Sequence, residues 1–132
     1  MPTVQFMSKE RVQEHMTPAY VLRIRHPGLA YSDLPIEHPE VITVNVMTDS
    51  LIDPETCEQI ISFCERAAAA NTDIVVHCNE GKYRSRMVAN FVWRFFEDYS
   101  DELVDWKGGE MSDRNYKSLY NHYKATRGER QR

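Results

Sequence analysis

Cys78 is the residue whose surroundings in the sequence give it the clearest capacity for chemistry. It follows the apolar run Asp73–His77, which predicts a short buried strand, and precedes a polar turn that contains Gly81. A helical segment from about Arg84 comes next. The amides of such a turn and the N-terminus of the helix favour an anion, and a glycine permits close approach of the backbone. The pattern predicts an anion cradle with a thiol at its floor.

The residues after Cys78 indicate that this anion is a phosphoryl group. A thiol has a pKa near ~8.5, which helix N-termini and neighbouring cations lower to roughly 3.5–7.5, and the thiolate is the nucleophile. Arg84 stands six positions after Cys78, and its planar fork can hold two phosphoryl oxygens. Ser85 can donate a hydrogen bond to the thiolate and ease its departure. These residues together favour phosphoryl transfer through a phosphocysteine.

The motif His-Cys-x-x-Gly-x-x-Arg-Ser resembles the signature loop of the protein tyrosine phosphatase superfamily, in its small dual-specificity-like branch of prokaryotic and phage type. The resemblance implies an α/β fold with a central, mostly parallel sheet flanked by helices, and a protein phosphatase activity without a cofactor. It assigns Cys78 as nucleophile, Arg84 as phosphate clamp, Ser85 as leaving-group helper and His77 as the residue that orients the loop. The substrate phosphate is expected to contact His77, Asn79, Glu80, Gly81, Lys82, Tyr83 and Arg84.

The same resemblance requires a general acid from a separate loop that follows a strand. Asp49 comes just after the β-branched run Val41–Val46 and 29 positions before Cys78. It would protonate the leaving oxygen and then act as base toward water. Asp53 is the rival at 25 positions, although its place before Pro54 suits a helix cap. We expect Asp49 to be the acid and keep Asp53 open.

Composition limits the remaining classes of function. The chain of 132 residues suits one domain, residues 1–132, with a polar and frayed tail over 127–132. A net charge of −4 gives no general attraction to nucleic acid or membrane, and no signal peptide is visible. Three cysteines without paired spacing indicate free thiols in the cytoplasm, and the histidines show no metal-ligand spacing. The expected partner is a phosphorylated protein or a small phosphomonoester.

Periodicity and capping residues predict the elements that position these groups. Helices are expected over about 8–15, from Pro54, from about 84 and after a cap at Ser112, and strands over 20–25, 41–46 and 73–77. Residues 26–39 are expected to form a long loop. The helix after Asp53 should bury a stripe formed by Cys57, Ile60, Ile61, Cys64 and Ala68. The last helix should bury Tyr116, Leu119, Tyr120 and Tyr123. Alternating strands and helices favour a partly parallel sheet with Cys78 at a carboxyl end, where such sheets bind ligands.

Three other functions remain open. Lys82 adds a cation to the loop and motivates a phosphoinositide phosphatase or an RNA 5′-phosphatase. A pseudophosphatase would bind phosphorylated partners without turnover, although Cys78, Arg84 and Asp49 are all present. A rhodanese-like sulfurtransferase also has a cysteine loop after a strand, but the interval that ends in Arg84 suits phosphate better.

Overall fold

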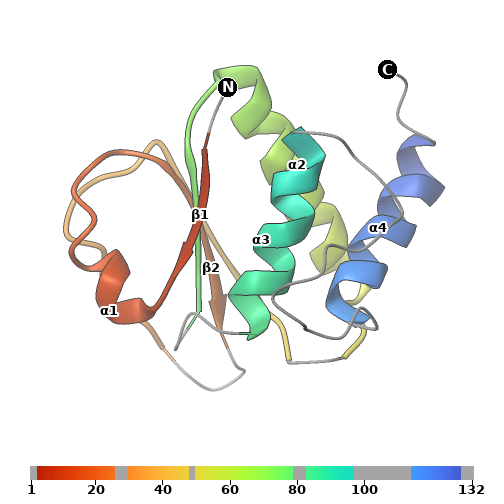
Figure 1. The fold of residues 1–132 in the computed structure, drawn as a ribbon, viewed down its shortest axis with the longest axis horizontal. Helices are drawn as coiled ribbons and strands as arrows, with labels where there is room; N and C mark the ends of the chain where they lie inside the picture. Colours follow the sequence, from red (N-terminus) through yellow and green to blue (C-terminus); the bar gives the residue numbers. More distant parts are fainter. Residues whose placement is uncertain (1–2, 26–29, 48–49, 79–82, 97–113, 129–132) are drawn as a thin grey trace.

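A single parallel sheet organises the chain in the computed structural model, which describes residues 3–25, 30–47, 50–78, 83–96 and 114–128; side chains are described for all of these except 83–86 and 96. The elements follow in the order β1 (Val4–Met7), α1 (Lys9–Val12), β2 (Tyr20–Arg25), β3 (Glu40–Asn45), α2 (Pro54–Ala70), β4 (Ile74–His77), α3 (Tyr83–Phe96) and α4 (Arg114–Arg127). The four strands lie in the order β1-β4-β2-β3, and every pair is parallel (Figure 1). This confirms the predicted α/β class.

The two faces of the sheet are covered differently. In Figure 1, α2, α3 and α4 lie on one side of the sheet, and α1 with the connection around residues 30–39 lies on the other. The period of two along a strand sends Leu22 and Ile24 of β2 into the larger core under α2 and α3. Val21 joins the smaller cluster on the α1 side, together with Val12. Burial on both sides of the sheet explains why β4 reads as a continuous apolar run over 74–76.

The N-terminal strand β1 is absent from the sequence prediction. Its four residues pair with β4, from Val4 opposite Ile74 to Met7 opposite His77. The backbone N–H of Thr3 also donates to Asp73 Oδ1 at 2.9 Å. The pairing places β4 in the interior of the sheet, between β1 and β2.

Helix α2 begins where Asp53 and Pro54 predict. The Asp53 side chain accepts a hydrogen bond from the backbone N–H of Thr56 at 2.8 Å, and Pro54 occupies the first turn. The helix ends at Asn71, whose φ of 52° is left-handed. The predicted stripe is confirmed except at Ala68, which is exposed; Phe63 and Ala67 are buried instead.

Helix α4 packs on α2 and α3 as an outer layer (Figure 1). Tyr116 and Leu119 are fully buried as predicted, while Tyr120 and Tyr123 are partly buried against the same core. The expected cap at Ser112 lies outside the described residues. No helix among the described residues is long and apolar enough to cross a membrane.

The prediction of a frayed tail from residue 127 is wrong at its first residue. Arg127 is the last residue of α4, and its terminal nitrogens donate to both carboxylate oxygens of Glu58 on α2, each at 2.7 Å. Glu65 accepts from the same guanidinium at 3.1 and 3.2 Å. Two carboxylates that are seven positions apart on the same side of α2 therefore hold the end of α4. The composition of the tail could not reveal this attachment.

The first helix is shorter than predicted. It spans Lys9–Val12, and Ser8 caps it as expected by accepting from the backbone N–H of Arg11 at 3.2 Å. Strand β3 spans Glu40–Asn45, one residue earlier than the predicted 41–46.

Candidate active site

Cys78 lies at the carboxyl end of β4, the position predicted for it. Its backbone N–H donates to the Met7 carbonyl at 3.3 Å, which continues the β1–β4 ladder by one residue. Its side chain is 2% exposed and belongs to the core on the α2–α3 side. Helix α3 begins at Tyr83, so residues 79–82 separate Cys78 from the helix. The predicted strand before Cys78 and the predicted helix after it are confirmed. The turn expected between them lies outside the described residues.

The rest of the signature loop is described only in part. Asn79, Glu80, Gly81 and Lys82 lie outside the described residues. Tyr83, Arg84 and Ser85 form the first turn of α3, and their backbone alone is described. The roles assigned to these side chains stay predictions.

His77 is fully buried, and an arginine on the neighbouring strand donates a hydrogen bond to its ring. The Nε–H of Arg23 donates to His77 Nε2 at 3.0 Å, across neighbouring strands in which the two residues are directly opposite. Burial, and then the positive charge of Arg23, lower the pKa of His77 to about 4, while a hydrogen bond with the Cys78 backbone opposes this. The ring is therefore neutral at pH 7 and lies next to Cys78.

Arg23 itself is an unpredicted member of the site. It is 8% exposed, its second terminal nitrogen donates to the Ser32 carbonyl at 2.8 Å, and its guanidinium lies 5.0 Å from the centre of the Tyr31 ring. Tyr31 also contacts the His77 ring at a centroid distance of 4.8 Å, and its hydroxyl donates to the Ile24 carbonyl at 2.6 Å. The sequence signal for Arg23 was a cation inside an apolar strand.

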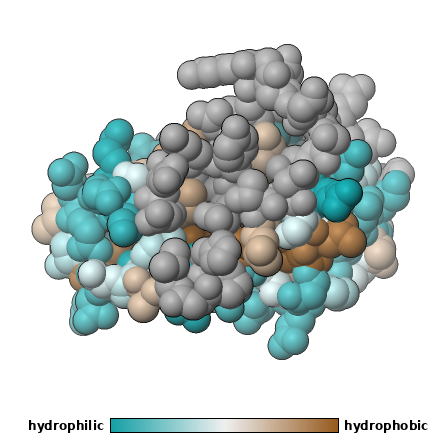
Figure 2. All heavy atoms as spheres, turned by 90° about the horizontal axis from the view of Figure 1, so that it is seen from below, coloured by the Kyte–Doolittle hydropathy of each residue, from teal (hydrophilic) through white to brown (hydrophobic). Residues whose placement is uncertain are grey.

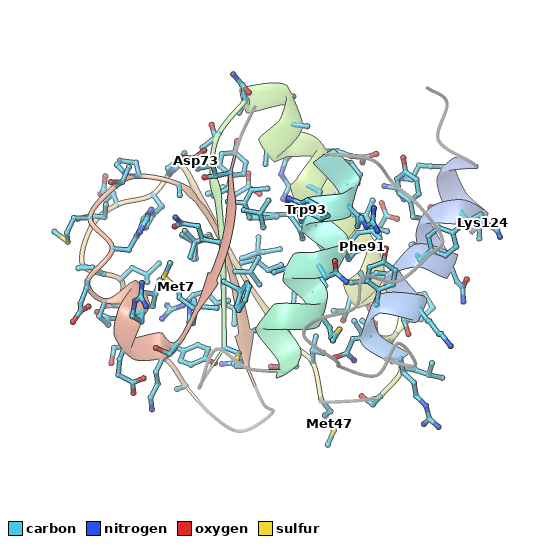
Figure 3. The ribbon with its side chains drawn as sticks, viewed as in Figure 1. Met7, Met47, Asp73, Phe91, Trp93 and Lys124 are labelled. Carbon is cyan, nitrogen blue, oxygen red and sulfur yellow. The ribbon has the colours of Figure 1, made fainter. Side chains whose placement is uncertain are left out.

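The segment expected to carry the general acid follows β3 at the same edge of the sheet. Figure 3 shows Met47 at this end of the molecule and Asp73, which precedes β4, at the opposite end. Asp49 and Thr48 lie outside the described residues, but Met47 and Ser50 on either side of this pair are described. The side-chain amide of Asn115 donates to the Met47 carbonyl at 3.2 Å and to the Ser50 carbonyl at 2.7 Å.

Asn115 is the second functional candidate that sequence reasoning missed. It lies in the first turn of α4 and is fully buried, so one amide group fixes both ends of the short stretch that contains Asp49. Ser50 Oγ also donates to the Met47 carbonyl at 2.9 Å, and Ser118 Oγ accepts from the Ile52 backbone N–H at 3.0 Å. Helix α4 thereby fastens Met47, Ser50 and Ile52.

The rival acid, Asp53, is engaged in capping α2. Its two oxygens accept from the backbone N–H and the hydroxyl of Thr56, at 2.8 and 3.1 Å. The backbone hydrogen bond from Thr56 is also the main reason that the pKa of Asp53 is lowered. The capping role that its place before Pro54 suggested is confirmed.

The other two cysteines are packing residues, as expected. Cys57 and Cys64 are free and lie within the core of α2. Burial raises the pKa of the Cys57 thiol to about 12 and raises that of Cys64 as well. Neither thiol forms a thiolate near neutral pH. Within the described part of the chain, no group of three or more His, Cys, Asp or Glu side chains could hold a metal ion.

The carboxyl ends of the parallel strands bring the two halves of the predicted site to one edge. His77 ends β4 and Cys78 follows it, Met47 and Ser50 follow β3, and β2 lies between these strands. Figure 2 looks onto this edge, where polar side chains predominate on the side of α1 and apolar ones are visible toward the middle and the opposite side. Parallel α/β sheets bind their ligands at such an edge.

Comparison with solved structures gives the same architecture. The chain is similar to the structure titled "Crystal structure of Tk-PTP in the active form", a protein tyrosine phosphatase, with a TM-score of 0.51 and 15% sequence identity over 97% of this chain and 82% of that one. The fold is phosphatase-like. No protein-family model matches the chain, and no curated protein sequence matches it. The structural likeness, at this identity, concerns the fold alone.

Proposed function

We propose that this protein hydrolyses phosphomonoesters through a phosphocysteine intermediate on Cys78, and that its substrates are phosphorylated proteins. The observation that carries the proposal is the position of Cys78, which directly follows an interior parallel strand and is separated from the first turn of α3 by four residues. Where a strand is followed closely by a helix, oriented backbone amides and the helix N-terminus can stabilise a bound anion. The motif from His77 to Ser85 and the phosphatase-like fold support the same reading independently of each other.

The first half of the reaction forms the intermediate. The Cys78 thiolate attacks phosphorus, a P–S bond forms and the bond from phosphorus to the leaving oxygen breaks. The Asp49 carboxylic acid gives its proton to that oxygen, so the product leaves as an alcohol or phenol. Arg84 holds two of the phosphoryl oxygens through both halves of the reaction.

The second half returns the enzyme to its starting state. The Asp49 carboxylate takes a proton from water, and the water oxygen attacks phosphorus. The P–S bond breaks, inorganic phosphate forms, and the Cys78 thiolate is regained with a hydrogen bond from Ser85. Asp49 ends the cycle protonated, as it began, so that no cofactor or metal is needed.

The decisive experiment is hydrolysis of a small aryl phosphate by the wild type and by Cys78→Ser, Arg84→Lys and Asp49→Asn variants. Acid quenching during turnover, followed by mass spectrometry of the peptide that contains Cys78, would detect the phosphocysteine. We expect Cys78→Ser to abolish phosphate release and the intermediate together. Cys64→Ser is the matched control, because it makes the same change at a buried thiol of α2.

Substrate class needs a separate comparison. We expect phosphotyrosine peptides to be hydrolysed faster than inositol phospholipids or RNA with a 5′-triphosphate. Tight binding of a phosphopeptide without phosphate release would replace the proposal with a phosphate-binding module. Thiocyanate formation from thiosulfate and cyanide would replace it with sulfur transfer.

A further inference from the structure

Arg23 combines two features that a purely structural residue does not need. It is a cation with 8% of its surface exposed, and its hydrogen bonds go to neutral acceptors, His77 Nε2 and the Ser32 carbonyl. No ion pair joins it to a carboxylate among the described residues, and Asp33 acts on it only at longer range. Burial accordingly lowers the pKa of Arg23. An apolar side chain in the same strand would avoid this desolvation cost.

The hydrogen bond from Arg23 determines where the proton of His77 lies. An arginine Nε–H can only donate, so His77 Nε2 must be the acceptor and carries no proton. A neutral imidazole then has its proton on Nδ1. Nδ1 is also buried and has no hydrogen-bond partner among the described residues. The interaction of the His77 ring with the Cys78 backbone, which raises the pKa of His77, leaves Nδ1 as the nitrogen that can donate to it, because Nε2 accepts from Arg23.

The aromatic ring of Tyr31 fixes the orientation of both partners. It lies 4.8 Å from the His77 ring and 5.0 Å from the Arg23 guanidinium, while its own hydroxyl is bound to the Ile24 carbonyl. The histidine can therefore neither turn over nor exchange its two nitrogens without breaking the contact with Arg23.

We propose that Arg23 is a positioning residue of the site at Cys78, which holds His77 as the neutral Nδ1–H tautomer so that this proton is donated to the Cys78 backbone. The functional part of this inference rests on the proposed phosphatase activity. A fixed donor at Cys78 holds the start of the loop in one conformation, and the nucleophile with it. Catalytic groups need such support, because small displacements of the nucleophile are costly.

Without Arg23, water could reach His77 Nε2, and the ring would no longer be restricted to the Nδ1–H tautomer. Two cavities of about 460 and 210 Å³ lie on the α1 side of the sheet, and Arg23 contributes to the walls of both. A shorter side chain would admit water beside His77 Nε2. Water donates and accepts equally well, so that either tautomer and the doubly protonated ring become accessible.

The first test uses the wild type and needs no activity. Nitrogen-15 NMR of histidine-labelled protein distinguishes a protonated from an unprotonated ring nitrogen, and a His77→Asn variant assigns the signals. We expect His77 to carry its proton on Nδ1 and none on Nε2 from about pH 8 down to about pH 5, the range over which ordinary histidines titrate. A proton on Nε2 within this range would overturn the proposal.

The second test links the tautomer to Cys78. Arg23→Met keeps an unbranched side chain but cannot donate, Arg23→Lys keeps a donor, and Arg66→Met is the control, since Arg66 pairs with Glu40 and does not contact His77. We expect Arg23→Met to give mixed tautomers at His77. The rate at which iodoacetamide modifies Cys78 should change with a shifted pH profile, and kcat on an aryl phosphate should fall about tenfold, equivalent to about 1.4 kcal/mol.

The outcomes separate this inference from the proposed function. If Arg23→Met is unfolded, the wild-type spectrum and Arg23→Lys decide, and Arg23→Lys should retain the Nδ1–H tautomer in part. An unchanged tautomer and unchanged Cys78 reactivity in a folded Arg23→Met protein would refute the positioning role. A wild type without phosphatase activity, but with an Arg23-dependent tautomer and Cys78 profile, would refute only the function.

Discussion

Replacing Asn115 by alanine should damage general acid catalysis more than it damages the fold. The substitution removes the two hydrogen bonds that the amide donates to the Met47 and Ser50 carbonyls. At about 1 kcal/mol for each neutral hydrogen bond, we expect the free energy of unfolding to fall by about 2 kcal/mol. Water can reach the two released carbonyls, because Met47 is half exposed and Ser50 is partly exposed, so no large further penalty arises.

The catalytic effect follows from what lies between those carbonyls. Residues 48 and 49 are the only ones between Met47 and Ser50, so the freed stretch is the one that carries Asp49. General acid catalysis contributes about 10²–10⁴ in rate, and its importance grows as the leaving group becomes a poorer one. We expect Asn115→Ala to reduce kcat/KM about tenfold more for phenyl phosphate than for an aryl phosphate with an acidic phenol.

The assay compares the two substrates in parallel with chemical denaturation. Arg127→Met is the control, because it weakens the attachment of the same helix without touching residues 47–50. The control should lose stability and keep the ratio of the two kcat/KM values. An unchanged ratio in Asn115→Ala, or an equal change in the control, would refute the idea that Asn115 holds the acid in place.

Three further predictions concern single ionisable groups. Arg127→Met should lower the free energy of unfolding, measured by urea titration, by about 1 kcal/mol at pH 7. Arg127 holds the pKa of Glu58 below its usual 4.5, so the difference between variant and wild type should shrink as the pH falls below about 5. Asp53→Ala should lower the free energy of unfolding by about 1 kcal/mol, because the helix cap is lost. The pH–rate profile of this variant should match that of the wild type; loss of the basic limb of the profile would instead identify Asp53 as the acid. Burial lowers the pKa of His77 from 6.5 to about 4, so protons favour the unfolded chain between these values. Stability should fall by up to about 3 kcal/mol from pH 6.5 to pH 4, and a His77→Asn variant should lose this dependence.

The elements that sequence reasoning predicted are those with strong local signals. Strand β4 is apolar on both faces up to His77, β2 alternates apolar and basic residues toward its end, and α2 opens with an aspartate and a proline at the positions that begin a helix. These signals lie within a few residues of each other, and the structure confirms them. The position of Cys78 after β4 was predictable for the same reason.

The misses depend on contacts between distant parts of the chain. Strand β1 has four residues and is specified by its pairing with β4, 70 positions later. Arg127 appeared as one more charge in a polar tail, and its partners Glu58 and Glu65 lie on α2. Neither pairing leaves a periodic or compositional mark at either end.

Buried polar side chains are the part of this fold that local reasoning recovers least, and they are also its best indication of function. Arg23 reaches His77 across 54 positions, and Asn115 reaches Met47 across 68. Each is nearly or fully buried, at a position where an apolar residue would pack at lower desolvation cost. One supports the histidine beside Cys78, and the other fastens the segment around Asp49. Packing alone would not require two such residues behind the two halves of one predicted site, whereas a reaction that needs a nucleophile and an acid held at fixed positions would.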